Sequence, residues 1–332
     1  MEDPMTDADK SDKPQTPPTT MVFAGDAAQA YAAFNLRDPY YPEMAGHVLN
    51  LALARHGEEY LGWAVDLGAG IGISTMVFHR YADKTFAVEP ESAMRAMCSL
   101  NVLGDPNVRV LEGRGENLAE TLGADAGMID TVLCSQAFHL FNPPGKPSLV
   151  PEVMRQVAEV LRSEGVFAFD LGPSNYAFKI QLQDHREPVS DDNPGIMTEL
   201  GHPLYREAEK AVKRSLVNRG IVREEDLPES LWPAAAARMD FLYLRTYAQR
   251  AGFQDLEVTE VLVPITGDRV IEFIRNSWTV FFRWGELSKL PMEVKMAVMG
   301  DALRELFSEN CVERYKHVCA YHPTAVLTCV KS

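Results

Sequence analysis

The chain has 332 residues, of which 46% are hydrophobic, with a formal net charge of −15 and an isoelectric point near 5.0. Binding to a nucleic-acid backbone relies on clustered lysine and arginine, so this acidity argues against a nucleic-acid substrate and favours a small molecule. The hydrophobic content suffices for a substantial core, built as one large α/β domain with additions or as two small domains. No apolar stretch approaches the roughly 18 residues that cross a bilayer, so we expect no membrane partner.

Residues 1–22 are acidic and rich in proline, which predicts a disordered tail. They show neither the apolar core of a secretory signal nor the pattern of a transit peptide. The cysteines, at positions 98, 134, 311, 319 and 329, form no C-x-x-C pair and are odd in number, which predicts reduced thiols in a cytoplasmic protein. His317, Cys319 and His322 are close in sequence but lack the spacing of a zinc site, so we expect no metal.

Residues 23–56 predict an N-terminal helical segment, with small and apolar residues at helical spacing from Asp26 to Leu36 and a helix from Glu43 to about His56. The stretch that follows, residues 64–72, is the most informative in the chain and reads Ala-Val-Asp-Leu-Gly-Ala-Gly-Ile-Gly. Its apolar part predicts a strand that ends near Asp66. The glycines after it leave room for a ligand to approach the backbone, and the helix predicted at residues 73–81 would direct its N-terminus at that ligand.

Two details of this region bear on the ligand. The dinucleotide pattern G-x-G-x-x-G would require a third glycine where this chain has Ile73, because the third glycine comes one residue early, at Gly72. The segment from Lys84 to Glu89 predicts a second strand that ends in an acid, 21 residues after Gly68. A carboxylate there can accept hydrogen bonds from both ribose hydroxyls of a nucleoside cofactor.

The remaining core elements follow from short apolar runs and turn signals. We expect strands at residues 108–111, 129–134, 166–171, 256–263 and 325–330, helices at residues 149–162 and 235–251, and a turn at residues 163–165. The core would then comprise residues 57–172, 234–266 and 318–332, interrupted by helical insertions at residues 173–233 and 267–317. Both insertions lie at the edge where α/β proteins bind ligands, so we expect them to select the substrate.

The insertions carry two informative helical patterns. From Val270 to Trp284 apolar residues occupy nearly every side of a helix, which fits either packing between cap and core or the lining of an apolar substrate pocket. From Tyr205 to Arg214 opposite charges recur at spacings of three and four, which is typical of a solvated helix with ion pairs; an anion-binding face is the alternative.

Two motifs resemble a known family. The D-x-G-x-G-x-G string from Asp66 to Gly72 is similar to motif I of the class I S-adenosylmethionine-dependent methyltransferases, and Ser-Gln-Ala-Phe-His-Leu-Phe at residues 135–141 resembles the "AQAxHWF" stretch of the small-molecule branch, which includes trans-aconitate-type and methyltransferase-11-like enzymes. The order of elements follows the family from about residue 28 to the C-terminus. The resemblance implies an α/β fold with a doubly wound, seven-stranded, mostly parallel Rossmann-like sheet, helices on both faces and helical cap insertions.

The resemblance also implies a cofactor, S-adenosyl-L-methionine, with S-adenosyl-L-homocysteine as the product. The cofactor-binding residues that it implies are Asp66, Gly68, Ala69, Gly70, Gly72, Glu89, Pro90, Gly115, Glu116, Ser135 and Gln136. At Gly115 and Glu116 only backbone contacts carry over. Arg114 departs from the family, which often has Asp or Ser there; a guanidinium has only donors and cannot accept from the adenine amine, so its role stays open.

Three residues are candidates for the catalytic site. His139, whose ordinary pKa is near 6.5, could act as a general base or shape the pocket by hydrogen bonding. Asp170, at the end of the fifth strand, could orient or deprotonate the substrate, or cap the following turn. Tyr31 belongs to an N-terminal stretch that partly matches the family's lid, together with Arg37, Tyr40, Tyr41 and Pro42. Tyr31 and Tyr40 act there as lid residues or as aromatic anchors, and Arg37 fits a surface ion pair.

The sequence therefore predicts an S-adenosylmethionine-dependent methyltransferase that acts on a small apolar metabolite, with O-methylation of a hydroxyl or carboxyl as the expected reaction. The alternatives are a C- or N-methyltransferase of specialised metabolism, a nicotinamide-dependent oxidoreductase, and a binding protein that keeps the cofactor pocket without turnover. The third glycine at Gly72 argues against the oxidoreductase. A homo-oligomer is possible.

Overall fold

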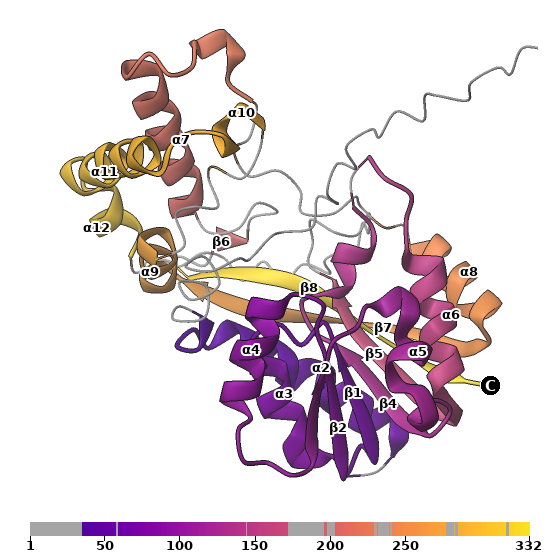
Figure 1. Cartoon of the computed structure of the whole chain (residues 1–332). Coiled ribbons are helices and arrows are strands. Elements are labelled where there is room, and N and C mark those ends of the chain that lie inside the picture. Colours follow the sequence, from indigo (N-terminus) through magenta and orange to yellow (C-terminus); the bar gives the residue numbers. More distant parts are fainter. Residues whose placement is uncertain are drawn as a thin grey trace, which may run out of the picture.

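The computed structural model describes residues 35–57, 59–143, 145–171, 196–197, 203–228, 231, 239, 241–276, 282, 285–316 and 319–332. The predictions for the N-terminal tail, for Tyr31, for most of the first insertion and for His317 lie outside this part of the chain. In the described part, a sheet covered by helices forms the body of the molecule, and a separate group of helices stands beyond one end of the sheet (Figure 1).

The sheet confirms the predicted fold class. Its strands are β1 (Trp63–Leu67), β2 (Lys84–Val88), β3 (Val108–Leu111), β4 (Ile129–Cys134), β5 (Leu161–Leu171), β6 (Ile196–Met197), β7 (Phe253–Thr266) and β8 (Cys319–Lys331). Their order is β3-β2-β1-β4-β5-β8-β6, and β7 also pairs with β8. Strands β1 to β5 are parallel, whereas β8 runs antiparallel to both β5 and β7. The short strand β6 extends the seven-stranded Rossmann-like sheet that the sequence predicts.

The direction of winding reverses between β1 and β4. From β1 the chain runs outward through β2 to β3 and then returns to place β4 on the other side of β1. Doubly wound sheets bind ligands at such a switch point, outside the carboxyl ends of the strands. Asp66, Glu89 and Ser135 lie at or directly after the carboxyl ends of β1, β2 and β4, so the topology brings them to one edge.

Helices cover both faces of the sheet (Figure 1). One face carries α2 (Tyr40–His56), α3 (Ile73–Phe78) and α4 (Ser92–Asn101), and the other carries α5 (Leu118–Leu122), α6 (Val150–Val160) and α8 (Phe241–Ala251). Short 3-10 turns link them: η1 (His79–Tyr81), η2 (Gly115–Asn117), η3 (Gly123–Asp125) and η4 (Phe138–Phe141). Because a parallel sheet is buried on both faces, its strands are apolar at nearly every position.

Each face has its own core. On the α6 side, the ring of Phe138 stacks on Phe169 with centroids 4.0 Å apart, and Phe169 stacks on Phe167 at 4.8 Å. On the α2 side, Met44 and Val48 are fully buried against the sheet. Helix α2 starts at Tyr40, before the predicted start at Glu43. Pro42 is compatible with this start since it lies in the first turn, where a missing N–H costs no hydrogen bond.

Strand β5 corrects one prediction. The turn expected at residues 163–165 lies inside β5, and α6 ends at Val160. The register with β4 shifts between the pairs Ile129↔Leu161 and Thr131↔Val166, and Glu164 has a φ of 64°. These residues form a bulge, which accommodates extra residues without ending the strand. Ser-Glu-Gly has the composition of a turn, but pairing with β4 keeps the backbone in the sheet.

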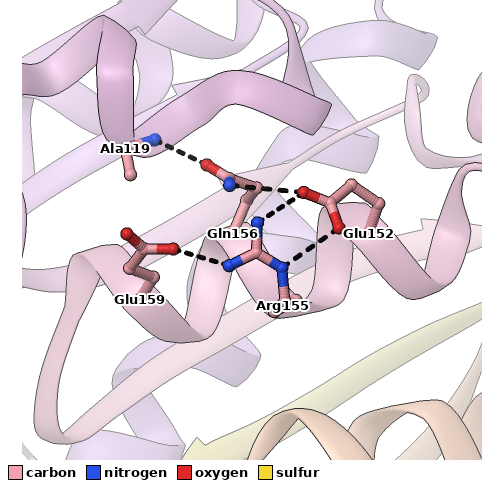
Figure 2. Close-up of polar contacts among 5 residues, drawn as sticks. All are labelled: Ala119, Glu152, Arg155, Gln156 and Glu159. Carbon is pink, nitrogen blue, oxygen red and sulfur yellow. Dashed lines mark hydrogen bonds and ion pairs between the residues drawn. The ribbon is translucent and has the colours of Figure 1, made fainter.

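A polar contact between α5 and α6 anchors the loop that leads out of β3 (Figure 2). The side-chain Oε1 of Gln156 on α6 accepts the backbone N–H of Ala119, in the first turn of α5, at 2.9 Å. Arg155 forms ion pairs along the same helix with Glu152 at 2.6 Å and with Glu159 at 2.9 Å. Gln156 is buried and satisfies one of the free N–H groups at the start of a helix, whereas the Arg155 pairs are exposed.

The helices α7 (Pro203–Asn218), α9 (Gly267–Asn276), α10 (Gly285–Ser288), α11 (Met292–Ser308) and α12 (Cys311–Tyr315) form a cap beyond the end of β7 and β8 (Figure 1). The 3-10 turn η5 (Glu224–Asp226) follows α7. The cap has a core of its own, in which Val270, Ile274 and Phe282 are buried against residues of α7 and α11. The same cluster includes Ile265 of β7, so these apolar residues pack among the cap helices and against the end of a sheet strand.

Helix α7 carries the predicted ion pairs. Lys210 pairs with Glu207 at 2.8 Å and Lys213 with Glu209 at 2.9 Å. The opposite face, including Leu204 and Val212, is buried in the cap core, so the helix is amphipathic rather than solvated all round. Elsewhere, Cys98, Cys134, Cys311 and Cys329 are free thiols. No helix in the described ranges has the length and hydropathy needed to span a membrane.

Candidate functional site

The glycine loop between β1 and α3 is held in a fixed shape. The N–H groups of Gly68 and Ala69 donate to the carbonyl of Val88 at 2.9 and 3.1 Å. The side-chain amide of Asn101 donates to the carbonyl of Ile71 at 2.8 Å. The loop is therefore tied to β2 on one side and to α4 on the other, so it is a preformed surface for a ligand.

Two of the glycines serve different purposes. Gly70 has a φ of +56°, and a Cβ placed on it would meet no atom within 4 Å, so Gly70 faces open space. Gly72 has a φ of +88°, and a Cβ there would lie 2.9 Å from Sγ of Cys98 on α4. Left-handed backbone favours glycine at both positions. Gly70 leaves room for a ligand, whereas Gly72 lets α4 approach the loop.

A cavity opens over this loop. It is lined by Tyr41 from α2, by Gly68, Ala69, Gly70, Ile71, Ile73 and Ser74 from the loop and the start of α3, and by Ser135 and Gln136 after β4. Five of the residues predicted to bind the cofactor line this cavity: Gly68, Ala69, Gly70, Ser135 and Gln136. Asp66 and Glu89 contact residues of its wall, as described next. Gly72, Pro90, Gly115 and Glu116, which were also predicted, are not among the lining residues.

Asp66 is a fully buried carboxylate beneath the loop. Its Oδ2 accepts hydrogen bonds from Ser74 Oγ at 2.7 Å and from Thr75 Oγ1 at 2.6 Å. Its Oδ1 is buried and has no hydrogen-bond partner among the described residues. Burial raises the pKa of Asp66 to about 6, although the two hydroxyls favour its ionised form. Since an unpaired buried oxygen is costly, Asp66 is suited to accept a donor from a ligand.

Glu89 stands directly after β2 and holds the loop from the other side. One oxygen accepts the N–H of Gly70 at 2.8 Å, and the other accepts the N–H of Glu91 at 2.9 Å. Burial raises the pKa of this carboxyl, and the two backbone donors oppose that rise. Each oxygen retains a lone pair that can accept one hydroxyl of a vicinal diol, so the geometry suits a ribose.

Arg95 of α4 fixes the position of Glu89. Its Nη1 donates to the carbonyls of Glu89 and Pro90 at 3.0 and 2.9 Å, and its Nη2 pairs with Glu112 after β3 at 2.7 Å. Arg95 thereby joins the carboxyl ends of β2 and β3. We did not predict a role for Arg95 or Asn101 from sequence, because both lie on an ordinary amphipathic helix and only the packing of α4 shows what they contact.

A buried carboxylate also organises the segment after β4. Asp170, at the end of β5, accepts hydrogen bonds from Ser135 Oγ at 3.1 Å and from Gln136 through its backbone N–H at 3.0 Å and its side-chain amide at 2.7 Å. Burial raises the pKa of Asp170 to about 7, against these three donors. Gln136 has a φ of 56°, which is unfavourable for a residue with a side chain. Asp170 thus holds a strained turn at the cavity wall.

The N-terminal segment and the cap meet next to this turn. The Oη of Tyr40 donates to Oε1 of Gln136 at 3.4 Å, and the guanidinium of Arg269 on α9 lies 4.3 Å from the centroid of the Tyr40 ring. Nε of Arg269 donates to both oxygens of the buried Asp38, at 2.6 and 2.7 Å. Neither this ion pair nor a role for Arg269 was predicted from sequence, since 231 residues separate Asp38 from Arg269.

The remaining predicted residues stand as follows. Burial lowers the pKa of His139 to about 4, so its imidazole is neutral at pH 7 and a weaker base than the expected value near 6.5 implied. Arg114 is exposed, and its backbone N–H donates to Asn117 Oδ1 at 3.0 Å. Gly115 is buried where a Cβ would lie 2.8 Å from the ring of Phe141. Arg37 is exposed. No cluster of His, Cys, Asp or Glu side chains suited to a metal occurs in the part of the chain described above.

Comparison with known proteins identifies the domain that carries this site. Residues 65–169 match the family model described as a methyltransferase domain. A segment of 108 residues is 29% identical to the probable S-adenosylmethionine-dependent methyltransferase CRG1 of Saccharomyces cerevisiae, and covers 32% of this chain and 34% of that protein. The match therefore spans about a third of the relative's length.

Solved structures of similar shape include two methyltransferases. Phosphoethanolamine N-methyltransferase 2 of Haemonchus contortus, in complex with S-adenosyl-L-methionine, is 12% identical over 94% of this chain and 58% of that chain, with a TM-score of 0.49. A putative sarcosine dimethylglycine methyltransferase of Galdieria sulphuraria is 12% identical over 93% of this chain and 99% of that chain, with a TM-score of 0.47.

Most of the site thus lies in a segment that matches a methyltransferase domain, the class of protein that the glycine motif and the Ser135–Phe141 stretch predicted. S-adenosylmethionine is named in the description of the yeast relative, and it is the cofactor that the two motifs predicted. The residues present fit that molecule. Gly70 leaves open space for the cofactor. Oδ1 of Asp66, which has no hydrogen-bond partner among the described residues, can accept from its ammonium group, and the spare lone pairs of Glu89 can accept from its ribose diol.

Proposed function

We propose that this protein transfers the methyl group of S-adenosylmethionine to a small-molecule acceptor. The observation that carries the proposal is the open glycine loop between two buried carboxylates. Gly70 faces empty space, and Asp66 has a buried oxygen without a partner among the described residues. The carboxylate of Glu89 accepts a hydrogen bond from the backbone N–H of Gly70 in the loop.

Each wall of the cavity has a role in this proposal. Glu89 accepts the ribose hydroxyls, and Asp66 accepts from the amino group of the methionine part. The backbone at Pro90, Gly115 and Glu116 borders the adenine, and Ser135 and Gln136 border the methionine part. When bound, the cofactor supplies an electrophilic methyl group on a sulfonium sulfur. The chain's own residues hold the acceptor in line with that group and exclude water.

A strong general base is not required for every acceptor. A carboxylate already carries the electron pair that forms the new bond, whereas a phenol or an amine must lose a proton. His139, with a pKa of about 4, accepts a proton only weakly at pH 7. Asp170 is occupied by three donors and serves in this proposal as a positioning residue for Gln136. These two observations favour O-methylation of an acceptor that is already ionised.

The test is a transfer assay with S-adenosylmethionine labelled in its methyl group and separate panels of alcohols, phenols, carboxylic acids and amines. Turnover with at least one panel, accompanied by release of S-adenosylhomocysteine, supports the proposal, and the panel identifies the atom that is methylated. The variant Glu89→Ala should lose turnover, and Glu120→Ala, an exposed acid on α5, should keep it. Tight cofactor binding without turnover in any panel would favour a non-catalytic binding protein instead.

The acceptor and the compartment belong to the same proposal. We propose a small-molecule acceptor rather than a nucleic acid, supported by the net charge of −15. A reducing compartment such as the cytoplasm is in keeping with four buried free thiols in the described chain.

A further inference from the structure

Arg269 has a guanidinium group of which only some N–H donors are hydrogen-bonded within the described part of the chain. It lies near the start of α9, with a side chain 12% exposed, and its Nε donates to both oxygens of Asp38. Its Nη1 is buried and has no hydrogen-bond partner among the described residues. A guanidinium has five N–H donors, and leaving one buried without an acceptor is costly. This donor is therefore free, within the described part of the chain, to bind an acceptor group.

The surroundings of Arg269 are aromatic. Its guanidinium lies over the ring of Tyr40, 4.3 Å from the ring centroid. Tyr41 and Tyr205 also interact electrostatically with the guanidinium. Burial raises the pKa of Tyr40 and of Tyr205, so both remain neutral phenols at any physiological pH. A planar cation between aromatic rings suits the carboxylate of a molecule whose remainder is apolar, because the charge is paired and the rest contacts rings.

This cluster adjoins the cofactor cavity. Tyr40 donates to Gln136, which lines the cavity, and Tyr41, whose ring makes an edge contact with that of Tyr40 at 5.4 Å, lines it as well. The contacts of Arg269 with Tyr40 and of Tyr40 with Tyr41 therefore connect Arg269 to the cavity over the glycine loop. A molecule held by Arg269 would lie beside the cofactor, between the sheet edge and the cap.

We propose that Arg269 binds the carboxylate of the acceptor, so that the substrates of this protein are apolar carboxylic acids. This inference rests on the proposed methyl transfer and names its substrate class. Nη1 and the adjacent edge of the guanidinium donate to the carboxylate, Asp38 holds the guanidinium in place through Nε, and Tyr40, Tyr41 and Tyr205 contact the apolar part. Asp38 is thus a positioning residue, and Arg269 sets specificity.

The experiment compares acids with their uncharged amides. Decanoate, decanamide, cinnamate and cinnamamide are titrated by calorimetry into the full-length protein saturated with S-adenosylhomocysteine. At least one acid should bind about tenfold or more tightly than its own amide, because only the acid forms charge-assisted hydrogen bonds. Equal binding of acid and amide in both pairs, or no binding of any probe, would overturn the proposal.

Variants assign the preference to Arg269. Arg269→Lys keeps the positive charge beside Asp38 but lacks the second N–H edge, and should reduce the preference for the acid to less than about threefold. Because Arg269→Gln alone would strand the buried Asp38, the neutral comparison is the double variant Asp38→Asn with Arg269→Gln, which should show no preference. The control is Arg275→Gln, an exposed arginine on the same helix. A preference that persists in both Arg269 variants would overturn the assignment.

Binding of S-adenosylhomocysteine is measured first in every variant. It should be unchanged within about threefold, because Arg269 is not among the residues that line the cofactor cavity. Failure of the wild-type protein to bind S-adenosylhomocysteine would contradict the proposed function itself. Cofactor binding with no distinction between acid and amide would contradict only the role of Arg269.

Discussion

At the scale of single residues, the site depends on carboxylates that are buried although the chain carries a large negative charge. Asp66, Glu89 and Asp170 all have raised pKa values because burial disfavours their charged forms. Each is compensated by hydroxyl or backbone donors from the segment that it organises. These acids therefore act as hydrogen-bond acceptors that shape loops. Burying their charges destabilises the fold, and all three lie at the ligand-binding edge of the sheet.

The stability of the cofactor-free protein should fall as pH rises through the titration range of Asp170. Its folded pKa of about 7 lies above the ordinary value of 3.8. The folded state therefore binds more protons between these values, and the contribution of Asp170 is complete below pH 4 and lost as pH rises through 7. In Asp170→Asn this part of the pH dependence should disappear. Urea unfolding at intervals from pH 4 to pH 8 measures it.

The control for that experiment is Glu120→Gln, which removes one exposed negative charge. It separates the effect of Asp170 from the general repulsion of a chain with a net charge of −15. An identical pH dependence in the wild type and Asp170→Asn would show that Asp170 titrates at its ordinary pKa in the folded protein.

The two glycines of the loop should respond differently to alanine. Both have positive φ, so each substitution should cost about 1–2 kcal/mol of backbone strain. Gly72→Ala also places a Cβ 2.9 Å from Sγ of Cys98, which should add about 1–3 kcal/mol of overpacking. Gly70→Ala meets no protein atom, but its methyl enters the space for the ligand, so it should mainly weaken binding of S-adenosylhomocysteine.

Chemical unfolding and calorimetric titration of both glycine variants would measure these effects. The expected result is a larger loss of unfolding free energy in Gly72→Ala and a larger loss of affinity per unit of lost stability in Gly70→Ala. The reverse order would mean that Gly72, rather than Gly70, borders the ligand.

At the scale of secondary-structure elements, the loop after β3 depends on helix α6. Gln156 accepts the N–H of Ala119, whereas neighbouring Arg155 forms only exposed pairs (Figure 2). Replacing Gln156 by Leu should cost about 1–3 kcal/mol of unfolding free energy, because it leaves the donor of Ala119 without its acceptor. Arg155→Met should change stability little, since exposed ion pairs contribute weakly. Thermal unfolding of the two variants compares them, and equal effects would contradict this interpretation.

The elements that could be predicted from sequence are those with local signals. Strands β3 and β4 lie at the predicted residues 108–111 and 129–134, because short apolar runs between turn residues define a buried strand. The bulge in β5 was missed because its residues have turn composition, and only the pairing of Leu161 and Val166 with β4 on either side of them keeps the strand in the sheet. Strands β7 and β8 extend beyond the predicted ends because they pair with each other along most of their length.

The site divides in the same way. The glycine loop, Asp66 and Glu89 could be placed from sequence because a strand, a turn and a helix succeed one another within one unit of chain. The group of Asp38, Tyr40 and Arg269 could not, since it joins segments 231 residues apart. Tyr41 was predicted as part of an N-terminal lid motif, and its position in the cavity wall follows only from the packing of α2.

At the scale of the whole molecule, the two longest strands of the sheet connect it to the cap. Residues Ala325 to Val330 of β8 pair with β5, but β7 and β8 continue together to Thr266 and Cys319, beyond the end of β5 (Figure 1). This antiparallel ribbon leads into α9 and the cap. The contact of Arg269 with Asp38 brings the cap back to the N-terminal segment, beside the cofactor cavity.

The central claim is that the glycine loop and its two acids bind S-adenosylmethionine, and titration calorimetry of the full-length protein with S-adenosylmethionine, S-adenosylhomocysteine and NADH tests it most directly. We expect both sulfur compounds to bind and NADH not to bind. In Glu89→Gln their affinity should fall by about tenfold or more, because a charged acceptor of the ribose diol is lost, with Glu120→Gln as the unaffected control. Binding of NADH alone, or binding of the sulfur compounds that is indifferent to Glu89→Gln, would contradict the account.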